Sequence, residues 1–417
     1  MHTERKLNLK QNMLYNTAGS LIYLACQWLT TIFVVRLASF EDAGILSLSM
    51  ASANMLTPIA SFGMRNYQVS DLSGTFSDGT YVSSRIISSF ACALASLIYI
   101  FAICEYKGYP ALCIFTYQIF YIADAIIDVF HGIDQRCSRM DIIGISLGLR
   151  GILMLSAFCA ILVMTGSLLL AVSGMAAISF AVLFVYDLPY TAFLKKFRAS
   201  LKDKRVLSLF RACAPLMLTG MFLSALVSIP RSFLGSSRGA EALGYYSSVA
   251  TPAVIVQIAA QWIFTPFTVP LTKCKNIGDR AGFMKQIKTV ILIFAVCLLV
   301  IMLGAVWLGD WGLELLFGEK ILDYSYLLVP VIGTTLLIAS LNFMSLLLTI
   351  FRRLDILLIT DVLGVIIALC VSNKLTSTFG MDGVNYSIFA GAGFVFLLQT
   401  VIMVITARTY FKEKTNG

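Results

Sequence analysis

The chain alternates long apolar runs with short polar connections over its whole length. The first run starts at Met13 and ends in Arg36, and the second contains Pro58 and ends at Arg65. Both runs reach the roughly 20 residues that a helix needs to cross a hydrocarbon core of about 30 Å. Twelve such runs predict twelve transmembrane helices, at about 13–37, 43–64, 83–104, 109–131, 142–164, 168–190, 208–236, 244–270, 287–308, 321–351, 354–373 and 382–407.

These runs are continuously apolar rather than alternating, which excludes a membrane β-barrel and favours helices, since lipid offers backbone groups no partner. The chain has 417 residues, of which 59% are hydrophobic and 13% charged, and its mean hydropathy is +0.86. A soluble protein carries about 25% charged residues. The sequence therefore predicts an all-α integral membrane protein without a soluble domain.

Lysine and arginine are distributed unevenly between the connections. If the runs are numbered in order, the tails and the even-numbered connections carry 24 of these residues and the odd-numbered ones carry five. Cytoplasmic loops are the ones enriched in positive charge. The bias predicts that both termini lie in the cytoplasm, and it accounts for the net charge of +9 without a nucleic-acid partner.

The longest of these basic connections predicts a division into two halves. An N-terminal lobe of six helices would cover 1–194, a basic cytoplasmic linker 195–207 and a C-terminal lobe 208–417. The halves also resemble each other weakly, in VVRLASFEDAG and SIPRSFLGSSRGAEALG. Two six-helix bundles related by a pseudo-two-fold axis along the membrane normal are a transporter plan.

Three arginines in or beside the predicted helices are candidates for anion binding. Arg36 and Arg231 suit a phosphate or diphosphate, because guanidinium stays charged and donates in a bidentate fork. The alternative is that they reach out to the lipid headgroups. Arg150 lies about two turns inside the fifth helix, where a charge is costly and must be paired or face water. It is either functional or part of a structural ion pair.

Acidic residues gather in the fourth helix. Asp124 and Asp128 are four residues apart and share a helix face, with His131 one turn further along. One interpretation is a coupling site for H⁺ or Na⁺; the other is that the two carboxylates are ion-pair partners of Arg85 or Arg150. A different spacing, in GISLGLRG, predicts close helix packing through Gly144, Gly148 and Gly151.

Cofactors and metals are not predicted. The ten cysteines are scattered through apolar segments without a CxxC pattern, and only two histidines are available. The sequence also contains no P-loop, no GxGxxG and no HExxH. The predicted outer connections are short, whereas an enzyme acting on an extracytoplasmic polymer is expected to carry a folded outer loop. We therefore expect a protein that is not an enzyme.

Several stretches resemble a known family. NTAGSLIYLACQWLTTIFVVRLASFEDAGILSLSMA with GMRNYQVSD is similar to the opening of bacterial polysaccharide-unit flippases. These proteins, which serve O-antigen, capsule or teichuronic-type repeats, belong to the multidrug/oligosaccharidyl-lipid/polysaccharide exporter superfamily. GIDQRCSRMDIIGISLGLRG resembles the family's pattern between its fourth and fifth helices, and EALGYYSSVATP resembles the start of its eighth helix. The resemblance covers essentially the whole chain and is not specific for one sugar.

The resemblance implies two six-helix lobes around a positively lined cavity and a multi-pass protein of the bacterial plasma membrane. It would move undecaprenyl-diphosphate-linked oligosaccharide to the outer leaflet by alternating access, coupled to an ion. The cationic role carries over to Arg36, Arg65, Arg150 and Arg231, while Asp124 and Asp128 remain candidates for ion coupling. Implied partners are the polyprenyl-diphosphate-linked glycan, membrane lipids and polysaccharide polymerase or assembly proteins.

Three other functions stay open. A multidrug or organic-cation antiporter of the same superfamily would need a cavity dominated by acids, whereas the intramembrane charges here are mixed. A membrane-embedded polysaccharide polymerase or acyltransferase would need outer loops and a His/Asp/Glu cluster. A peptidoglycan-precursor flippase is related, but such proteins usually have fourteen helices rather than twelve.

Overall fold

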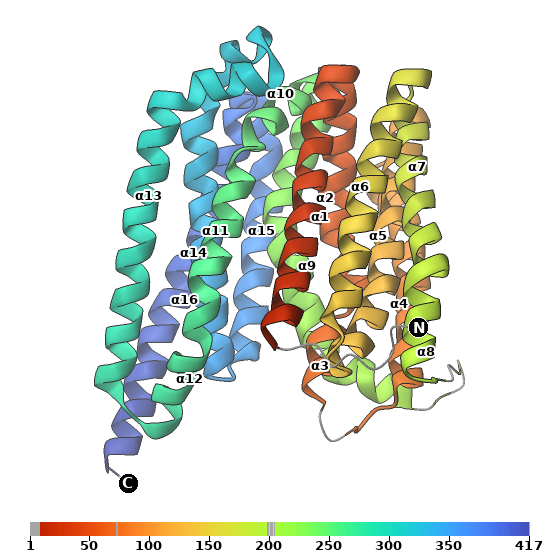
Figure 1. The fold of residues 1–417 in the computed structure, drawn as a ribbon. Coiled ribbons are helices and arrows are strands. Elements are labelled where there is room, and N and C mark those ends of the chain that lie inside the picture. The colour runs from red at the N-terminus through yellow and green to blue at the C-terminus, as the bar shows by residue number, and fades with distance from the viewer. Residues whose placement is uncertain (1–8, 72–73, 198–199, 201–202, 204, 417) are drawn as a thin grey trace. The chain divides into compact units, whose positions relative to one another are not determined.

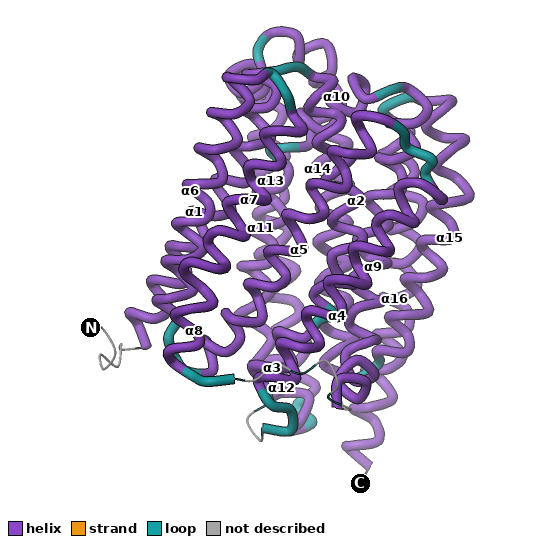
Figure 2. The backbone as a smooth tube through the Cα atoms, turned by 90° about the vertical axis from the view of Figure 1, so that its right-hand side faces the viewer, coloured by secondary structure: helices purple, strands orange, loops and turns teal. Residues whose placement is uncertain are grey.

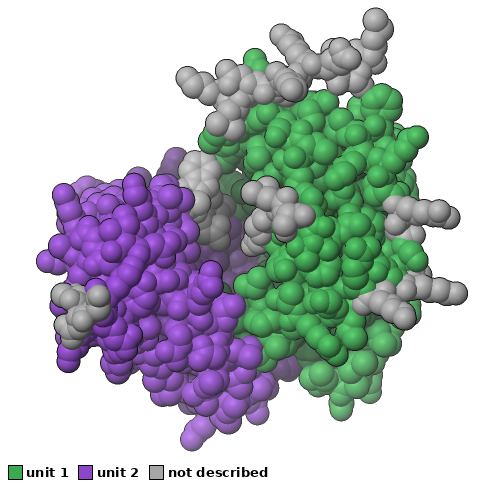
Figure 3. Space-filling view, turned by 90° about the horizontal axis from the view of Figure 1, so that it is seen from below, with its two compact units in different colours: residues 1–224 green, residues 225–417 purple. Residues whose placement is uncertain are grey.

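The computed structural model describes residues 9–71, 74–197, 200, 203 and 205–416 (Figure 1). Throughout this part of the chain the regular elements are helices, joined by short turns (Figure 2). The residues pack into two compact units, unit 1 over 1–224 and unit 2 over 225–417, coloured separately in Figure 3. The division lies inside one long helix, so that helix contributes to both units. The predicted all-α class is confirmed.

Unit 1 contains the first six membrane crossings and the first part of the seventh. Its elements are α1 (Leu9–Leu37), α2 (Phe40–Ser61), α3 (Met64–Ser70), α4 (Asp78–Ile98), η1 (Tyr99–Ile103), α5 (Gly108–Arg136), α6 (Met140–Thr165), α7 (Leu168–Val182), η2 (Leu183–Asp187), α8 (Leu188–Leu194) and the beginning of α9 (Arg205–Arg238). The elements η1 and η2 are single π-helical turns that continue α4 and α7.

Helix α5 is the centre of unit 1, since α2, α4 and α7 all pack on it and the short helix α3 lies against it as well. Helix α1 packs mainly on α6. Side chains define the starts of several helices: the Ser39 hydroxyl accepts a hydrogen bond from the backbone N–H of Asp42 at 3.1 Å, and Ser77 does the same for Thr80 at 3.1 Å. Serine at this position satisfies backbone donors that the first turn leaves free.

Unit 2 contains the rest of α9 and the elements that follow it. These are α10 (Ala240–Ala250), α11 (Ala253–Phe264), η3 (Thr265–Phe267), α12 (Thr268–Ile277), α13 (Arg280–Phe317), η4 (Glu319–Leu327), α14 (Leu328–Ile350), α15 (Leu354–Phe379) and α16 (Asp382–Asn416). Helix α14 is central here, in contact with α11, α13, α15 and α16.

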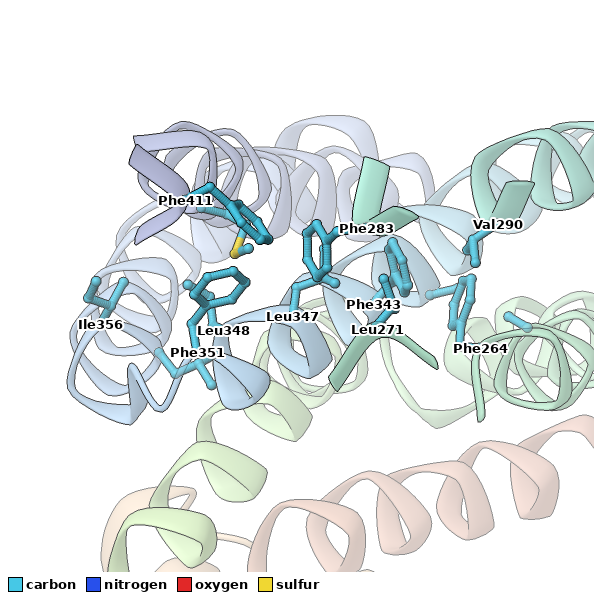
Figure 4. Packing of buried hydrophobic residues seen from close by; sticks show 14 residues of the cluster. Phe264, Leu271, Phe283, Val290, Phe343, Leu347, Leu348, Phe351, Ile356 and Phe411 are labelled. Atoms are coloured by element: carbon cyan, nitrogen blue, oxygen red, sulfur yellow. The ribbon is translucent and has the colours of Figure 1, made fainter. Parts of the chain in front are cut away.

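Aromatic side chains fill the core of unit 2 at the end of α14 (Figure 4). The ring centroids of Phe264 and Phe343 are 4.9 Å apart. Phe283 lies 5.4 Å from Phe411 and 5.7 Å from Phe351. These contacts tie α11, α13, α14 and α16 together, and tilted or edge-on aromatic pairs at such distances add to the burial of apolar area.

Eleven helices within the described residues are long and apolar enough to cross a membrane. The remaining predicted crossing, 244–270, is formed by α10, α11 and α12 in succession. A break at Thr251 and Pro252 separates α10 from α11, and the 3₁₀ turn η3 around Pro266 separates α11 from α12. Proline interrupts a helix because it lacks the backbone N–H and its ring clashes with the preceding turn. Twelve crossings therefore fit the chain, one of them broken.

Helix α13 is the longest element and the least covered by protein. It runs for 38 residues and is the most hydrophobic of the spans, yet only 6% of its most apolar stretch is buried within the protein. Trp307 and Trp311 near its C-terminal end are largely exposed. A helix that is apolar on all sides is suited to contact with lipid.

Candidate functional site

Helix α5 carries the acidic residues predicted from the sequence, and the structure surrounds them with arginines from neighbouring helices. We define the α5 polar cluster as Tyr23 on α1, Arg65 on α3, Arg85 on α4, Asp124 and Asp128 on α5, and Arg150 on α6. All six residues belong to unit 1. The cluster divides into two ion-pair groups, one around each aspartate.

Asp128 binds two arginines, one on each carboxylate oxygen. Nη1 of Arg65 donates to Oδ1 at 2.6 Å, and Nη2 of Arg85 donates to Oδ2 at 3.1 Å. Arg65 is also held by Gln135, whose side-chain oxygen accepts from Nη2 at 2.9 Å and from Nε at 3.3 Å. Nη1 of Arg85 donates to the carbonyl of Ala60 at 3.0 Å. Asp128 therefore connects α3 and α4 through α5.

Asp124 forms the second group, with Arg150 and Tyr23. Nη1 of Arg150 lies 2.9 Å from Oδ1 of Asp124, and the Tyr23 hydroxyl donates to Oδ2. The guanidinium of Arg150 lies over the Tyr23 ring, 4.4 Å from its centroid. Tyr23 is the middle residue of α1, and Asp124 is about 18 Å from the end of α5 at the usual rise per residue. This group is deep in the span.

The glycines of α6 explain how the second group forms. A Cβ on Gly151 would lie 2.9 Å from Cα of Tyr23, and a Cβ on Gly144 would lie 2.1 Å from the carbonyl oxygen of Tyr15. Helices α1 and α6 therefore approach each other at backbone distance, which confirms the close packing predicted from GISLGLRG. The approach brings the Tyr23 ring over Arg150.

The ion pairs favour one of the two interpretations given to the acidic residues. Asp128 pairs with Arg85 and Asp124 pairs with Arg150, as the structural interpretation predicts. Ion coupling through either carboxylate stays a prediction. With all groups ionised, the three arginines and two aspartates of the cluster leave one positive charge in excess. A membrane-embedded charge is tolerated when it is paired or reaches water.

Two further buried contacts lie on α5, further toward its C-terminal end. The His131 ring nitrogen Nε2 is 3.1 Å from Oδ1 of Asp187, at the end of the π-helical turn η2. The Thr191 hydroxyl donates to both oxygens of Asp134, at 3.0 and 3.1 Å. These contacts fix η2 and α8 against α5, and we assign them a packing role.

Charged residues also tie the connection after α8 to the start of α4. Asp78 pairs with Arg136 at 3.1 Å and with Lys195 at 2.5 Å. Oδ2 of Asp203 accepts from the Thr80 hydroxyl at 2.6 Å. This hydrogen bond, with a second from a backbone N–H, lowers the pKa of Asp203.

Arg231 is the intramembrane arginine of unit 2, and its surroundings differ from those in unit 1. It is half-buried on α9, and its guanidinium lies 5.9 Å from the centroid of the Tyr246 ring. The Tyr246 hydroxyl donates to Oδ1 of Asn385 at 2.9 Å. Nε of Arg231 and Nδ2 of Asn385 are buried without a hydrogen-bond partner. Within the described ranges no carboxylate forms an ion pair with Arg231.

Arg36 and Arg231 hold matching places in the weak resemblance between the two halves, but they lie at different depths in their helices. Arg36 is exposed one residue before the end of α1, whereas Arg231 lies seven residues, or about 10 Å, before the end of α9. Arg238, the last residue of α9, is the counterpart of Arg36 by position. The structure therefore groups Arg65, Arg150, Asp124 and Asp128, and leaves Arg36 apart at a helix end.

Sequence reasoning missed two residues of this environment and only partly described a third. Tyr23 gave no signal among many membrane tyrosines, and Gln135 is polar at the end of a helix where polar residues are ordinary. Arg85 was predicted as a partner for an acid, and it does bind Asp128; what sequence reasoning did not predict is that its side chain is fully buried. Its position inside an apolar run, between serines at 83, 84, 88 and 89, was the available signal.

Metal binding has no visible basis in the part of the chain that the structure describes, since no group of three or more His, Cys, Asp or Glu residues comes together there. The expectation that no cofactor is needed stays a prediction. What the site offers chemically is guanidinium groups in membrane helices, most of them neutralised by carboxylates and one not.

Solved structures with the same fold are transporters. An inward-facing multidrug resistance MATE family transporter of the MOP superfamily superposes with a TM-score of 0.73 at 13% identity, over 96% of this chain and 99% of that one. A MOP superfamily transporter from Pyrococcus furiosus, described as having a binding pocket of reverse polarity, gives a TM-score of 0.61 at 15% identity, over 96% of each chain. At such identities the likeness establishes the fold, and it confirms the two-bundle transporter architecture.

The capsular polysaccharide biosynthesis protein CapF of Staphylococcus aureus is 23% identical over 323 residues, which are 76% of this chain and 80% of CapF. The sequence pattern of one protein family matches residues 9–272, well over half of the chain. With its many membrane helices and this match, the chain is a multi-pass membrane protein that belongs to the polysaccharide biosynthesis protein family.

Proposed function

We propose that this protein is a flippase that moves undecaprenyl-diphosphate-linked oligosaccharide from the cytoplasmic to the outer leaflet of a bacterial plasma membrane. The diphosphate and the glycan cannot enter hydrocarbon without partners, because burying an unpaired charge or polar group is costly. The family is one of polysaccharide biosynthesis, and the fold is that of transporters. Transport of a lipid-linked intermediate unites these two facts without assigning an enzymatic step to the chain.

Arg231 is the observation that carries the proposal. A guanidinium in a membrane helix without a carboxylate partner is expensive unless an anion or water meets it. A phosphate group supplies charge and acceptor oxygens in the geometry that guanidinium binds best. Nδ2 of Asn385 also lacks a hydrogen-bond partner and adds a neutral donor. Asn385 is linked to Arg231 through Tyr246, whose hydroxyl binds Asn385 and whose ring faces the guanidinium. We assign Arg231 to the diphosphate.

We assign the remaining predicted residues roles that range from direct binding to indirect support. Arg65 binds the headgroup, since its side chain is partly exposed, and Arg36 attracts anions at the end of α1. Asp124 and Tyr23 keep Arg150 in place, and we assign Arg150 an indirect role that depends on these two residues. A coupling ion, H⁺ or Na⁺, would act on the carboxylates of α5. Polysaccharide polymerase or assembly proteins would receive the glycan.

A multidrug cation exporter fits the residues less well. A cationic drug needs a carboxylate free to neutralise it, and both aspartates of the α5 polar cluster are already bound to arginines. Arg231, in unit 2, would also repel a cation. The charges therefore support an anionic substrate.

The test is deletion of the gene followed by complementation in a strain that makes the polysaccharide. We expect the deletion to accumulate lipid-linked repeat units that stay accessible only from the cytoplasm. Arg231→Ala should lower export roughly tenfold or more, because a hydrogen bond to a charged group is worth about 1.5–3 kcal/mol. Arg231→Lys should retain part of the export, since lysine keeps the charge but not the fork.

Arg238→Ala is the matched control, because Arg238 is on the same helix but exposed, and it donates to the carbonyl of Ser377 at 2.8 Å. We expect near-normal export from this variant at equal protein level. Normal export by Arg231→Ala would remove Arg231 from the site. A deletion strain with repeat units already facing outward would refute the flippase itself.

A further inference from the structure

Solvent access distinguishes the two ion-pair groups of the α5 polar cluster. The side chains of Arg65 and Asp128 are 26% and 32% exposed, so the bond between them is within reach of a ligand. Arg150 is 4% exposed and Asp124 18%, and the Tyr23 ring covers Arg150. The Arg65–Asp128 bond is therefore the contact in this cluster that an outside anion can reach.

The two bonds of Asp128 differ in how easily they can break, because Arg85 is buried and Arg65 is not. The Arg85 side chain is completely buried, with Nη1 bound to the carbonyl of Ala60 and Nη2 bound to Asp128. Removing the carboxylate from Arg85 would leave a buried charge without a counter-ion, which is strongly destabilising. Arg65, by contrast, can lose the carboxylate and remain solvated, and Gln135 still holds it through Nε and Nη2. Asp128 must therefore stay bound to Arg85, whereas a ligand can replace it on Arg65.

We propose that Asp128 is a specificity residue that occupies Arg65 in the empty protein and is displaced from it by the phosphate of the substrate. This inference rests on the flippase function proposed above and concerns how the headgroup is selected and released. Nη1 of Arg65 leaves Oδ1 of Asp128 and donates to a phosphate oxygen. Asp128 keeps its bond to Arg85, so no buried charge is left alone.

The exchange selects for anions with phosphate-like oxygens. A neutral or cationic headgroup offers nothing that replaces the carboxylate on Arg65, so the internal bond persists. A diphosphate presents more charge and more acceptor oxygens than one carboxylate, and guanidinium binds phosphate in the same forked manner. The exchange also limits affinity, because binding must compete with Asp128, and it helps release because Asp128 returns to Arg65.

Asp128→Asn tests the inference in the purified full-length protein in detergent or nanodiscs. Asparagine keeps the shape and an acceptor for Arg85 and removes the charge that competes for Arg65. Because buried Arg85 then lacks its counter-ion, the variant is compared at an equal amount of folded protein. We expect the dissociation constant for inorganic pyrophosphate to fall roughly tenfold, the equivalent of one charged hydrogen bond. Farnesyl diphosphate should show a similar ratio, which places the effect on the phosphate rather than the lipid. Adding Arg65→Gln to this variant should abolish the gain.

Asp141→Asn is the matched control for the loss of one carboxylate beside an arginine. Asp141 pairs with Arg139 at 2.8 Å, also partly exposed and in the same unit, but outside the cluster. We expect its affinity for pyrophosphate to change less than twofold. Equal gains in both variants would reduce the effect to general electrostatics, and no gain in Asp128→Asn would refute the exchange.

A measurement on the unmodified protein guards against a variant that fails to fold. Phenylglyoxal modifies accessible arginines, and peptide mass spectrometry locates the products. Pyrophosphate should protect Arg65 and leave Arg139 reactive. Equal reactivity of Arg65 with and without pyrophosphate would overturn the inference. If the flippase function itself is wrong, the deletion strain will show repeat units with normal topology. This result does not depend on the binding data, so the two hypotheses can be distinguished.

Discussion

The arginines in the membrane helices have two kinds of partner. In unit 1, Arg65, Arg85 and Arg150 each contact a carboxylate on α5, whereas Arg231 in unit 2 contacts the face of Tyr246. Membrane helices tolerate arginine only with such support. The sequence could predict that these arginines need partners, because the depth of a charge follows from its place in an apolar run. It could not predict which partner each one takes, because that depends on how the helices pack.

The pairing of Asp128 with both Arg65 and Arg85 illustrates this limit. The four-residue spacing on α5 predicts that Asp124 and Asp128 share a face, and both indeed meet arginines from neighbouring helices. The assignment of Arg65 needs α3, a seven-residue helix that follows a left-handed turn at Phe62 and Gly63. No periodicity in the sequence indicates that turn.

A double-mutant cycle on Arg150 and Asp124 should show the energetic weight of the deeper pair. Removing one partner, in Arg150→Met or Asp124→Leu, should lower the free energy of unfolding by about 3 kcal/mol, because the other charge is left unpaired in a buried place. The double variant should recover most of this loss. Unfolding of the purified protein in detergent, followed by circular dichroism, measures all four proteins.

The exposed pair of Arg353 and Asp355 provides the control for that cycle. Their side chains are 43% and 62% exposed at a distance of 3.3 Å, and such pairs contribute about 1 kcal/mol or less. Equal coupling energies in the two cycles would mean that burial does not matter for Arg150 and Asp124.

At the scale of helices, the contact between α1 and α6 depends on glycine. A Cβ on Gly19 would lie 2.0 Å from the carbonyl oxygen of Gly144, and backbone atoms cannot move aside as flexible side chains can. The glycine spacing on α6 was visible in the sequence. The partner helix was not, because α1 and α6 are far apart along the chain.

Gly144→Ala should therefore push α1 away from α6 and lower stability by about 1–3 kcal/mol, the usual cost of overpacking. Separation of the two helices should also weaken the contact of Tyr23 with Arg150. Gly304→Ala on α13 is the matched substitution, since a Cβ there meets nothing within 4 Å. It should be neutral or slightly stabilising, because alanine favours helix over glycine. Gly144→Ala should have the lower melting temperature of the two variants, and the reverse order would contradict the prediction.

The eighth crossing shows a second limit of sequence reasoning at this scale. Hydropathy located it at 244–270, a run that contains Pro252, Pro266 and Pro270. The structure goes further and divides it into α10, α11 and α12. Proline is tolerated in many membrane helices, so its presence alone could not tell a bend from a complete break.

For the whole molecule, the class and fold followed from the sequence, because continuous apolar runs leave few alternatives to a helical bundle. The orientation in the membrane rests on the distribution of lysine and arginine and remains our prediction. A fluorescent protein fused after Gly417 should fold and fluoresce, since the C-terminal tail is expected in the cytoplasm.

An alkaline phosphatase fused at the same position should be inactive, because that enzyme needs the oxidising outer compartment for its disulfides. The same phosphatase fused after Lys320, in a predicted outer connection, should be active. The opposite pattern at both positions would invert the topology and, with it, the proposed direction of transport.

The length of α13 has a consequence for the membrane around the protein. Its 38 residues extend about 57 Å, against a hydrocarbon thickness of about 30 Å. We expect the excess to be taken up by tilting, or by helix ends that lie among the headgroups, where Lys285 and Lys288 suit anionic phosphates and Trp307 and Trp311 suit the opposite interface. We therefore expect bilayer thickness to act on unit 2 through the tilt of this helix, and the lipid composition of the host to influence the activity of the protein.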